Sequence, residues 1–177
     1  MEFKKYTKDY VELAKRFSCG NMVIDNFLKD GDALDENQGI TYILLSDDES
    51  VIIGYYNISV GRVDLAEEVN GKIIYSPMGG SANINYLAVD KEFQHTPLDE
   101  NIKVYFGDCI LRDCELRIYE LRQKIGIQFV TLCSTKEGYH MYYDRNSYEN
   151  FEEDMNNFVR ESDTSSYKLY KCVDDIY

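Results

Sequence analysis

The sequence of 177 residues has no tryptophan, only two prolines and only two histidines, His95 and His140. Its five cysteines include no Cys-x-x-Cys pair, and nothing in the chain has the spacing of zinc ligands, so we expect no metal site. The odd cysteine count and the lack of a secretory signal peptide predict reduced thiols. No apolar run approaches the roughly 20 residues of a membrane span. These absences predict a cytoplasmic protein without a membrane segment.

Basic residues are also scarce, because 19 lysines and arginines stand against 32 aspartates and glutamates and give a net charge of −13. A protein that binds the phosphate backbone of a nucleic acid needs a basic face. The composition therefore disfavours nucleic acid and anionic membranes as partners. A negative field favours cationic partners instead.

Apolar residues are plentiful. Hydrophobic residues make up 44% of the chain and aromatic residues 14%, including 16 tyrosines, which is enough to build a core and excludes disorder as the default. The length is typical of one compact unit. We therefore expect residues 1–177 to form a single domain.

The periodicity of the apolar residues predicts a definite order of elements. Helical spacing predicts two short helices near the N-terminus, a long central helix and a short late helix, whereas β-branched runs and alternation predict strands between them. The expected helices are 8–17, 22–29, 96–124 and 136–145. The expected strands are 41–45, 51–60, 71–75, 82–90, 127–133, 148–151 and 167–173. Residues 152–166 are polar and acidic and are expected on the surface.

The long helix has the clearest start signal. Thr96 is suited to the N-cap, Pro97 to the first helical position and Asp99 to the third position of a capping box. The sequence therefore predicts that the helix begins at Thr96.

Four local patterns accompany this order of elements. They are Phe17-x-Cys19-Gly20 followed by Ile24-Asp25-Asn26-Phe27-Leu28; Ile53-Gly54-Tyr55-Tyr56-x-Ile58-Ser59; Tyr86-Leu87-Ala88-Val89-Asp90-x-x-Phe93-Gln94; and Tyr142-Tyr143-Asp144-Arg145-Asn146-Ser147-Tyr148. In order and spacing, across roughly residues 17–148, they resemble the GNAT superfamily of N-acetyltransferases. The first resembles the signature of its toxin-type branch, whose members acetylate aminoacyl-tRNA. The last is similar to Phe-Tyr-Glu-Lys-x-Gly-Phe, with Ser147 at the glycine.

The resemblance implies an α+β fold with a mixed, mostly antiparallel central sheet and helices on both faces. It also implies acetyl-CoA as the co-substrate, with main-chain groups of Leu87 and Val89 beside the thioester and the pyrophosphate at the N-terminus of the next helix. The resemblance also implies that Tyr143 is the general acid that protonates the departing CoA thiolate.

One stretch departs from the superfamily pattern. Relatives have Gln/Arg-x-x-Gly-x-Gly/Ala, in which glycines let the backbone wrap the pyrophosphate, but here both glycines are missing and Pro97 lacks an N–H. Asp99 and Glu100 would place two carboxylates in the first helical turn, where they would repel a pyrophosphate. The cofactor-binding residues that the resemblance implies are Leu87, Val89, Gln94, His95, Thr96, Leu98 and Asp99.

Two functions follow from this departure. The first is an active acetyltransferase with a divergent loop, in which His95 and Lys91 or Lys103 offset the acidic turn. The alternative is a catalytically degenerate GNAT fold that serves as a protein-interaction module. For an active enzyme the charge disfavours tRNA and favours a cationic primary amine, either a small molecule such as a polyamine or aminoglycoside or a lysine-rich protein tail. A homodimer is compatible with the sequence, which does not identify an antitoxin-like partner.

Overall fold

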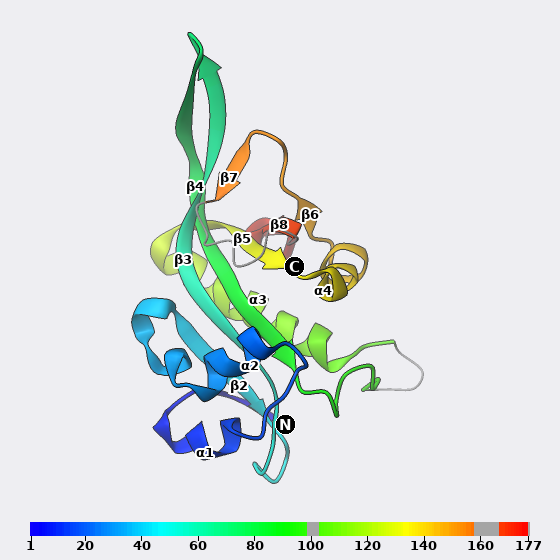
Figure 1. Cartoon of the computed structure of the whole chain (residues 1–177). Helices are drawn as coiled ribbons and strands as arrows, with labels where there is room; N and C mark the ends of the chain where they lie inside the picture. Colours follow the sequence, from blue (N-terminus) through cyan, green and yellow to red (C-terminus); the bar gives the residue numbers. More distant parts are fainter. Residues whose placement is uncertain (99–102, 158–166, 177) are drawn as a thin grey trace. The chain divides into compact units, whose positions relative to one another are not determined.

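The computed structural model describes residues 1–98, 103–157 and 167–176 (Figure 1). The chain forms two compact units. Unit 1 is Met1–Ser59 with Asn85–Cys114, and unit 2 is Val60–Ile84 with Glu115–Tyr177. Strands β3 (Ile52–Val69) and β4 (Lys72–Val89) and helix α3 (Phe106–Ile125) each contribute residues to both units.

Eight strands are present in the described part of the chain, and they pair in the order β1-β2-β3-β4-β5-β8-β6, with β7 beside β3. β4 and β5 are parallel, whereas β1–β2, β2–β3, β3–β7, β5–β8 and β6–β8 are antiparallel. The predicted α+β class with a mostly antiparallel sheet is confirmed. The remaining strands are β1 (Glu2–Lys5), β2 (Ile40–Leu45), β5 (Ile127–Ser134), β6 (Glu149–Asn150), β7 (Met155–Asn157) and β8 (Tyr167–Cys172).

The helices are mostly short apart from α3. The α-helices are α1 (Val11–Ala14), α2 (Met22–Lys29) and α4 (Lys136–His140), which continues into a π-helical turn, η4 (Met141–Arg145). Short 3-10 turns are η1 (Lys8–Tyr10), η2 (Asp32–Leu34), η3 (Glu36–Gln38) and η5 (Val173–Ile176). Among the described residues, no helix is both long and apolar enough to cross a membrane.

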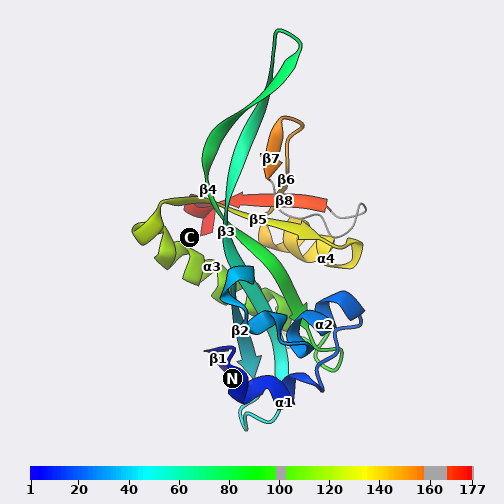
Figure 2. The same cartoon turned by 60° about the vertical axis from the view of Figure 1, so that its left-hand side comes forward.

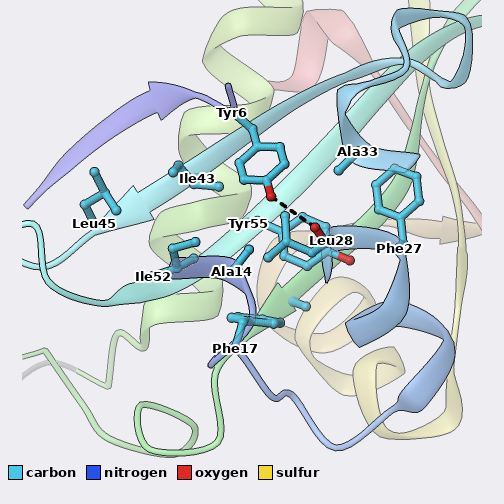
Figure 3. Close-up of a cluster of buried hydrophobic side chains, with 11 residues drawn as sticks. Tyr6, Ala14, Phe17, Phe27, Leu28, Ala33, Ile43, Leu45, Ile52 and Tyr55 are labelled. Carbon is cyan, nitrogen blue, oxygen red and sulfur yellow. Dashed lines mark hydrogen bonds between the residues drawn. The ribbon is translucent and has the colours of Figure 1, made fainter. Parts of the chain in front are cut away.

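The core of unit 1 forms where the two N-terminal helices cover one face of β2 and β3 (Figure 3). Phe17 packs edge-on to the buried Tyr55 ring at 5.4 Å, and Phe27 stacks on the same ring at 6.3 Å. The Tyr6 hydroxyl donates to the Leu28 carbonyl at 3.1 Å, so the tyrosine adds a buried hydrogen bond to its packing. Asn21 caps α2 by accepting from the Val23 N–H.

The opposite face of β3 in unit 1 is covered by the first half of α3. A Cβ on Gly54 would lie 2.4 Å from the Ile110 side chain, so glycine allows the helix to approach. Tyr56 points to the same side and donates from its hydroxyl to Asp113 at 2.5 Å. Within unit 1 the sheet therefore has helices on both faces, as predicted.

Unit 2 has a separate apolar cluster. Its buried members are Val63 on β3, Phe129 on β5 and Met155 on β7, and Tyr170 on β8 lies at its edge with its ring 6.2 Å from Phe129. β5 pairs in parallel with residues 80–84 of β4, and its residues 129–134 pair antiparallel with β8. This cluster anchors the far half of the β3–β4 hairpin.

Three expectations need correction. The expected strands 71–75 and 82–90 are one strand, β4, which runs without a break from Lys72 to Val89 after the Asn70-Gly71 turn (φ +55° and +74°). The expected helix over 96–124 begins only at Phe106. β1 and β7 were not expected, since the first is short and charged and the second lies in an acidic stretch.

Candidate active site

The loop of residues 18–20 is bound to the segment that follows β4, and both lie in unit 1. The Ser18 N–H donates to the Asp90 carboxylate at 2.8 Å, and the Lys91 N–H donates to the Ser18 carbonyl at 2.9 Å. Gly20 has φ +97°, and a Cβ there would lie 2.9 Å from the Lys91 side chain. The Cys-Gly pattern is thus explained by a close approach and a positive φ.

Asp25 holds the same loop from α2. Its buried carboxylate accepts from the Cys19 N–H at 2.7 Å and from the Ser18 hydroxyl at 3.2 Å. Burial alone would raise the pKa of Asp25, but the hydrogen bonds from Cys19 and Ser18 outweigh burial and hold the pKa below its ordinary value. Burial and the neighbouring Asp25 raise the pKa of the Cys19 thiol to about 12, so this thiol is not a nucleophile near neutral pH.

Gln94 joins the two segments through its side chain. Its amide nitrogen donates to the Cys19 carbonyl at 2.9 Å and to the Val89 carbonyl at 2.8 Å. Both N–H bonds of the amide are therefore used inside the protein. The Gln94 side chain therefore ties the Cys19 carbonyl to the end of β4. The two donors of this side chain are not available to a phosphate.

The end of β4 contains Leu87 and Val89, the two residues whose main-chain groups the resemblance implies beside the thioester. Leu87 and Val89 are both partly buried, and they precede Asp90, whose N–H donates to the Ile53 carbonyl at 2.8 Å. Two hydrogen bonds fix this strand end, one from the Gln94 amide to the Val89 carbonyl and one from the Asp90 N–H to β3. Its peptide groups are therefore held in place before any substrate binds.

The stretch after Gln94 is a loop and not a helix. His95 has φ +60° and is exposed, as is Thr96, and Thr96 does not cap a helix. Leu98 donates from its N–H to the Val104 carbonyl at 2.8 Å, next to a bridge between Pro97 and Tyr105. Asp99 lies outside the described residues.

Helix α3 starts with a different cap from the one predicted. The Asp108 carboxylate accepts from the Tyr105 N–H at 3.0 Å, which is the acidic half of a capping box. The first turn consists of Phe106, the buried Gly107 and Asp108, and its leading N–H groups have no partner within the helix. The acid in this turn, Asp108, already serves as a cap.

Tyr143 lies in unit 2, in the π-helical turn after α4. Its ring is 43% exposed and stacks on Tyr139 at 5.1 Å, and Tyr139 in turn contacts Tyr167 at 4.6 Å. Turns of π-helix are rare and occur often at functional sites. On the same turn, His140 contacts Asp144 through its Nδ1.

The turn that carries Tyr143 is fixed by buried contacts on its far side. Asn146 donates to the Met141 carbonyl at 2.8 Å, and the Tyr148 N–H donates to the Tyr142 carbonyl at 3.1 Å. Lys171 on β8 donates to the Asn146 carbonyl at 3.2 Å.

Lys171 is held in turn by a buried carboxylate. Its ammonium group lies 3.1 Å from the Glu115 carboxylate of α3, with side chains only 10% and 4% exposed, and 5.5 Å from the centre of the Tyr148 ring. Neither Glu115 nor Lys171 was predicted from the sequence. The pattern that could have suggested them is an acid inside the apolar stripe of α3 and a lysine in a strand.

Several solved structures resemble this one, while the sequence matches no protein-family profile and no curated protein. A Tyr-to-Phe mutant of the toxin AtaT matches with a TM-score of 0.73 and 16% identity, over 99% of this chain and 91% of that one. A Tyr-to-Phe mutant of KacT matches with 0.71 and 18%, over 99% and 96%. AtaTR bound with acetyl-CoA matches with 0.66 and 17%, over 99% and 94%. The chain has the GNAT fold.

The first turn of the long helix differs from the one expected. The sequence predicted this turn at 96–99, directly after Gln94, whereas α3 begins ten residues later, at Phe106. Gly107 stands in the first helical turn, followed by Asp108.

The predicted residues fall into two groups on this GNAT fold. Leu87, Val89, Gln94, His95, Thr96 and Leu98 belong to unit 1, and Tyr143 belongs to unit 2. Unit 1 brings Val89 and Gln94 into direct contact, whereas His95 and Thr96 are exposed on the loop. In residues 1–98, 103–157 and 167–176, no three acidic, cysteine or histidine side chains gather as metal ligands would.

Proposed function

We propose that this protein is an N-acetyltransferase that transfers the acetyl group of acetyl-CoA to a primary amine. The observation that carries the proposal is the match over 99% of the chain to a toxin complex that was solved with acetyl-CoA. The fixed end of β4 adds support, because a site for a thioester needs peptide groups that are held in place.

The co-substrate would be held by unit 1. Main-chain groups of Leu87 and Val89 would pair with the acetyl and pantetheine part, and the first-turn N–H groups at Phe106 and Gly107 would receive the pyrophosphate. Gly107 fits this role because it has no side chain to block the approach. Asp108 weakens the fit by its charge, although its carboxylate is engaged by the Tyr105 N–H.

Tyr143 would act as the general acid. The amine nitrogen attacks the acetyl carbonyl carbon, the bond between carbon and sulfur breaks, and the sulfur takes the proton of the Tyr143 hydroxyl. The phenolate then regains a proton that the new amide nitrogen releases. The partial exposure of the ring leaves it accessible to a substrate, and the stack on Tyr139 limits its rotation.

The acceptor would be cationic. With a net charge of −13, the protein attracts polyamines, aminoglycosides or lysine-rich tails and repels the tRNA backbone. Assays with spermidine, an aminoglycoside and an aminoacyl-tRNA under identical conditions test this, with acetylation of the first two and not of the third as the expected result. Acetylation of the aminoacyl-tRNA alone would contradict the cationic acceptor while leaving the transferase intact.

Acetyl-CoA binding and turnover test the enzyme itself. Calorimetry should show acetyl-CoA binding to the wild type and equally to Tyr143→Phe, while the variant should lose about 10²- to 10⁴-fold in kcat. Tyr75→Phe is a matched control, since Tyr75 is 46% exposed and lies on the hairpin. Unchanged transfer by Tyr143→Phe would remove the general-acid role.

The alternative is a GNAT fold that has lost catalysis and binds a protein partner. Its main support was the loss of both glycines next to two carboxylates, and Gly107 in the first turn of α3 weakens that support. If calorimetry and thermal shift both show no binding at millimolar acetyl-CoA, this alternative replaces the enzyme.

An antitoxin polypeptide is the partner that the neighbours suggest. AtaT was solved with the C-terminus of the antitoxin AtaR, and both KacTA and AtaT–AtaR were solved with DNA. We propose that this acidic chain likewise binds a polypeptide partner, through which any contact with nucleic acid would be made. Induced expression in a bacterial host should arrest growth, and Tyr143→Phe should not. Equal growth with both would contradict a toxin role.

A further inference from the structure

The hydroxyl group of Tyr143 has no anchor of its own. The side chain is 43% exposed, and its oxygen makes no hydrogen bond in the part of unit 2 that the structure describes. A hydroxyl without a protein partner can donate its proton to a substrate, but no contact at the oxygen fixes its direction. The direction of the Tyr143 hydroxyl therefore depends on what holds the ring.

The ring of Tyr143 is held by the ring of Tyr139, which lies one turn earlier on α4. The ring centres are 5.1 Å apart and the ring planes differ by only 17°. Residues four apart lie on the same side of a helix, so the spacing of the two tyrosines allows this stack. Tyr143 cannot turn about its side-chain torsions without losing the contact, and its orientation therefore follows that of Tyr139.

Tyr139 is itself held at its hydroxyl group by Asn150. The amide nitrogen of Asn150 donates to this hydroxyl at 2.9 Å, and the hydroxyl donates to the amide oxygen at 3.3 Å. One amide thus both donates to and accepts from the same phenol, which fixes the long axis of the Tyr139 ring. Asn150 lies on β6 and pairs with Leu169 of β8, so its backbone is fixed by the sheet.

A third tyrosine contacts the ring of Tyr139 from the sheet. Tyr167 is the first residue of β8, and its ring centre lies 4.6 Å from that of Tyr139 with the planes tilted by 52°. Figure 2 shows α4 beside β5 and β8 in unit 2, and Tyr167 pairs there with Ser134 of β5. Tyr139 thus contacts β6 through its hydroxyl and β8 through its ring. Since β6 and β8 pair with each other, one edge of the sheet holds Tyr139.

These contacts are too exposed to be explained by the stability of the core. Tyr167 is 42% exposed, Asn150 is exposed and Tyr139 is only half-buried. Hydrogen bonds that water can replace contribute little net stability. The core contact of the same turn is made by Tyr142 and Tyr148, whose buried rings lie 5.5 Å apart. Loss of the exposed contacts should therefore leave the fold intact.

We infer that Tyr139 is a positioning residue for the Tyr143 hydroxyl. Asn150 and Tyr167 act one step earlier, because they fix Tyr139. The inference rests on the proposed function, in which Tyr143 gives its proton to the sulfur of the departing CoA. Proton transfer requires the two heavy atoms to approach to about 2.6–3.2 Å, and a ring that is free to turn meets this condition only part of the time. The three supporting residues need not touch the substrate, since they act through Tyr143.

Steady-state kinetics of the full chain test the inference, with acetyl-CoA and whichever of spermidine, the aminoglycoside and the aminoacyl-tRNA the wild type acetylates. Tyr139→Leu should lower kcat by about 10-fold and leave the KM for acetyl-CoA unchanged, because binding does not use the hydroxyl. Tyr139→Phe keeps the ring and should retain most of the activity. In a Tyr143→Phe background, Tyr139→Leu should cause no further loss, because no hydroxyl is left to position. Tyr75→Leu, at an exposed tyrosine of the same unit, is the matched control and should leave kcat unchanged.

Fluorine NMR reports the position of the Tyr143 ring without turnover. With 3-fluorotyrosine incorporated at residue 143, the ring of Tyr139 should shift the signal away from that of the free amino acid. Tyr139→Leu should move the signal toward the free value, and Tyr139→Phe should not. An unmoved signal in Tyr139→Leu, an unchanged kcat in that variant, or a further loss of kcat in the Tyr143→Phe background would each overturn the inference.

Failure of the proposed function gives a different result. A wild type that acetylates none of the three acceptors would overturn the proposed function, and with it the catalytic use of the stack, even where the fluorine signal shows that the rings are stacked. A wild type that is active while Tyr139→Leu is equally active would overturn the positioning role alone.

Discussion

Each unit has one loop that is held by a buried charge, and the two charges are of opposite sign. In unit 1 the loop of residues 18–20 is fixed by carboxylates, because Asp25 and Asp90 accept its N–H groups. In unit 2 the turn after Tyr143 is fixed by a cation, because Lys171 donates to the Asn146 carbonyl while paired with Glu115.

This difference predicts how much stability is lost when one of the charged residues that hold each loop is substituted. A carboxylate that accepts several N–H groups contributes hydrogen bonds, and its loss costs those bonds. In a buried ion pair, the attraction between the two charges offsets their cost of desolvation only while both are present. Loss of one partner therefore leaves the cost of burying the other charge without that offset. The unit 2 turn should therefore be the more sensitive of the two to single substitutions.

The largest effect is expected from Lys171→Met. It removes the buried cation 3.1 Å from the buried Glu115 carboxylate and should lower the free energy of unfolding by about 3–5 kcal/mol, measured by urea denaturation. The double variant Lys171→Met with Glu115→Leu should recover most of this loss, because it removes the charge as well. A double variant no more stable than the single one would mean that the pair is not the cause.

A smaller loss is expected from Asp25→Asn. The amide cannot replace the charge that Cys19 and Ser18 contact, so the variant should lose about 1–3 kcal/mol of stability in the same urea assay. Asp30→Asn, at an exposed residue just after the same helix, is the control and should change stability by less than about 0.5 kcal/mol. Equal losses in both would show that the loop contact contributes little.

The same carboxylate predicts a pH dependence. The pKa of Asp25 is lowered in the folded state from an ordinary value of 3.8. Its contribution is therefore present above the unfolded pKa and is lost as the pH falls through the folded one. The stability gap between the wild type and Asp25→Asn should be full at neutral pH and should shrink below about pH 4. A gap that does not change with pH would contradict this account.

The smallest effect is expected at Ser147, which has φ +57°. A left-handed conformation costs a serine about 1–2 kcal/mol, partly offset by the entropy that glycine loses on folding. Ser147→Gly should therefore raise stability by up to about 1 kcal/mol in urea denaturation, whereas Ser76→Gly, on the exposed part of β4, should lower it. A loss in both would mean that the strain at residue 147 is relieved elsewhere.

Much of the fold could be predicted because the capping residues and apolar periodicity that specify an element lie within that element's own stretch of sequence. Helix 22–29 matches α2 residue for residue, since a capping asparagine and an apolar stripe specify it. The start of α3 was misplaced, because Thr96-Pro97 is a strong local start signal, whereas Pro97 forms an isolated bridge with Tyr105 and the helix begins at Phe106. β7 was missed because its pairing partner is ninety residues away in sequence.

The candidate site was predictable only in part for a similar reason. The pattern around Tyr143 could be read from adjacent residues, as could the strand end at Leu87 and Val89. The role of Gln94 depends on Cys19, 75 residues earlier, and the support of the Tyr143 turn depends on Lys171. Such contacts join segments with no local relation, so no spacing in the sequence reports them.

The Asn70-Gly71 turn bears on how the chain folds. Asparagine followed by glycine favours this turn without help from distant residues, and hairpins closed by such turns form in about 1–10 µs. The β3–β4 hairpin can therefore form from its turn before its later partners β5 and β7 pair with it. A newly made chain would therefore present this apolar ribbon early, before the rest of the sheet is complete.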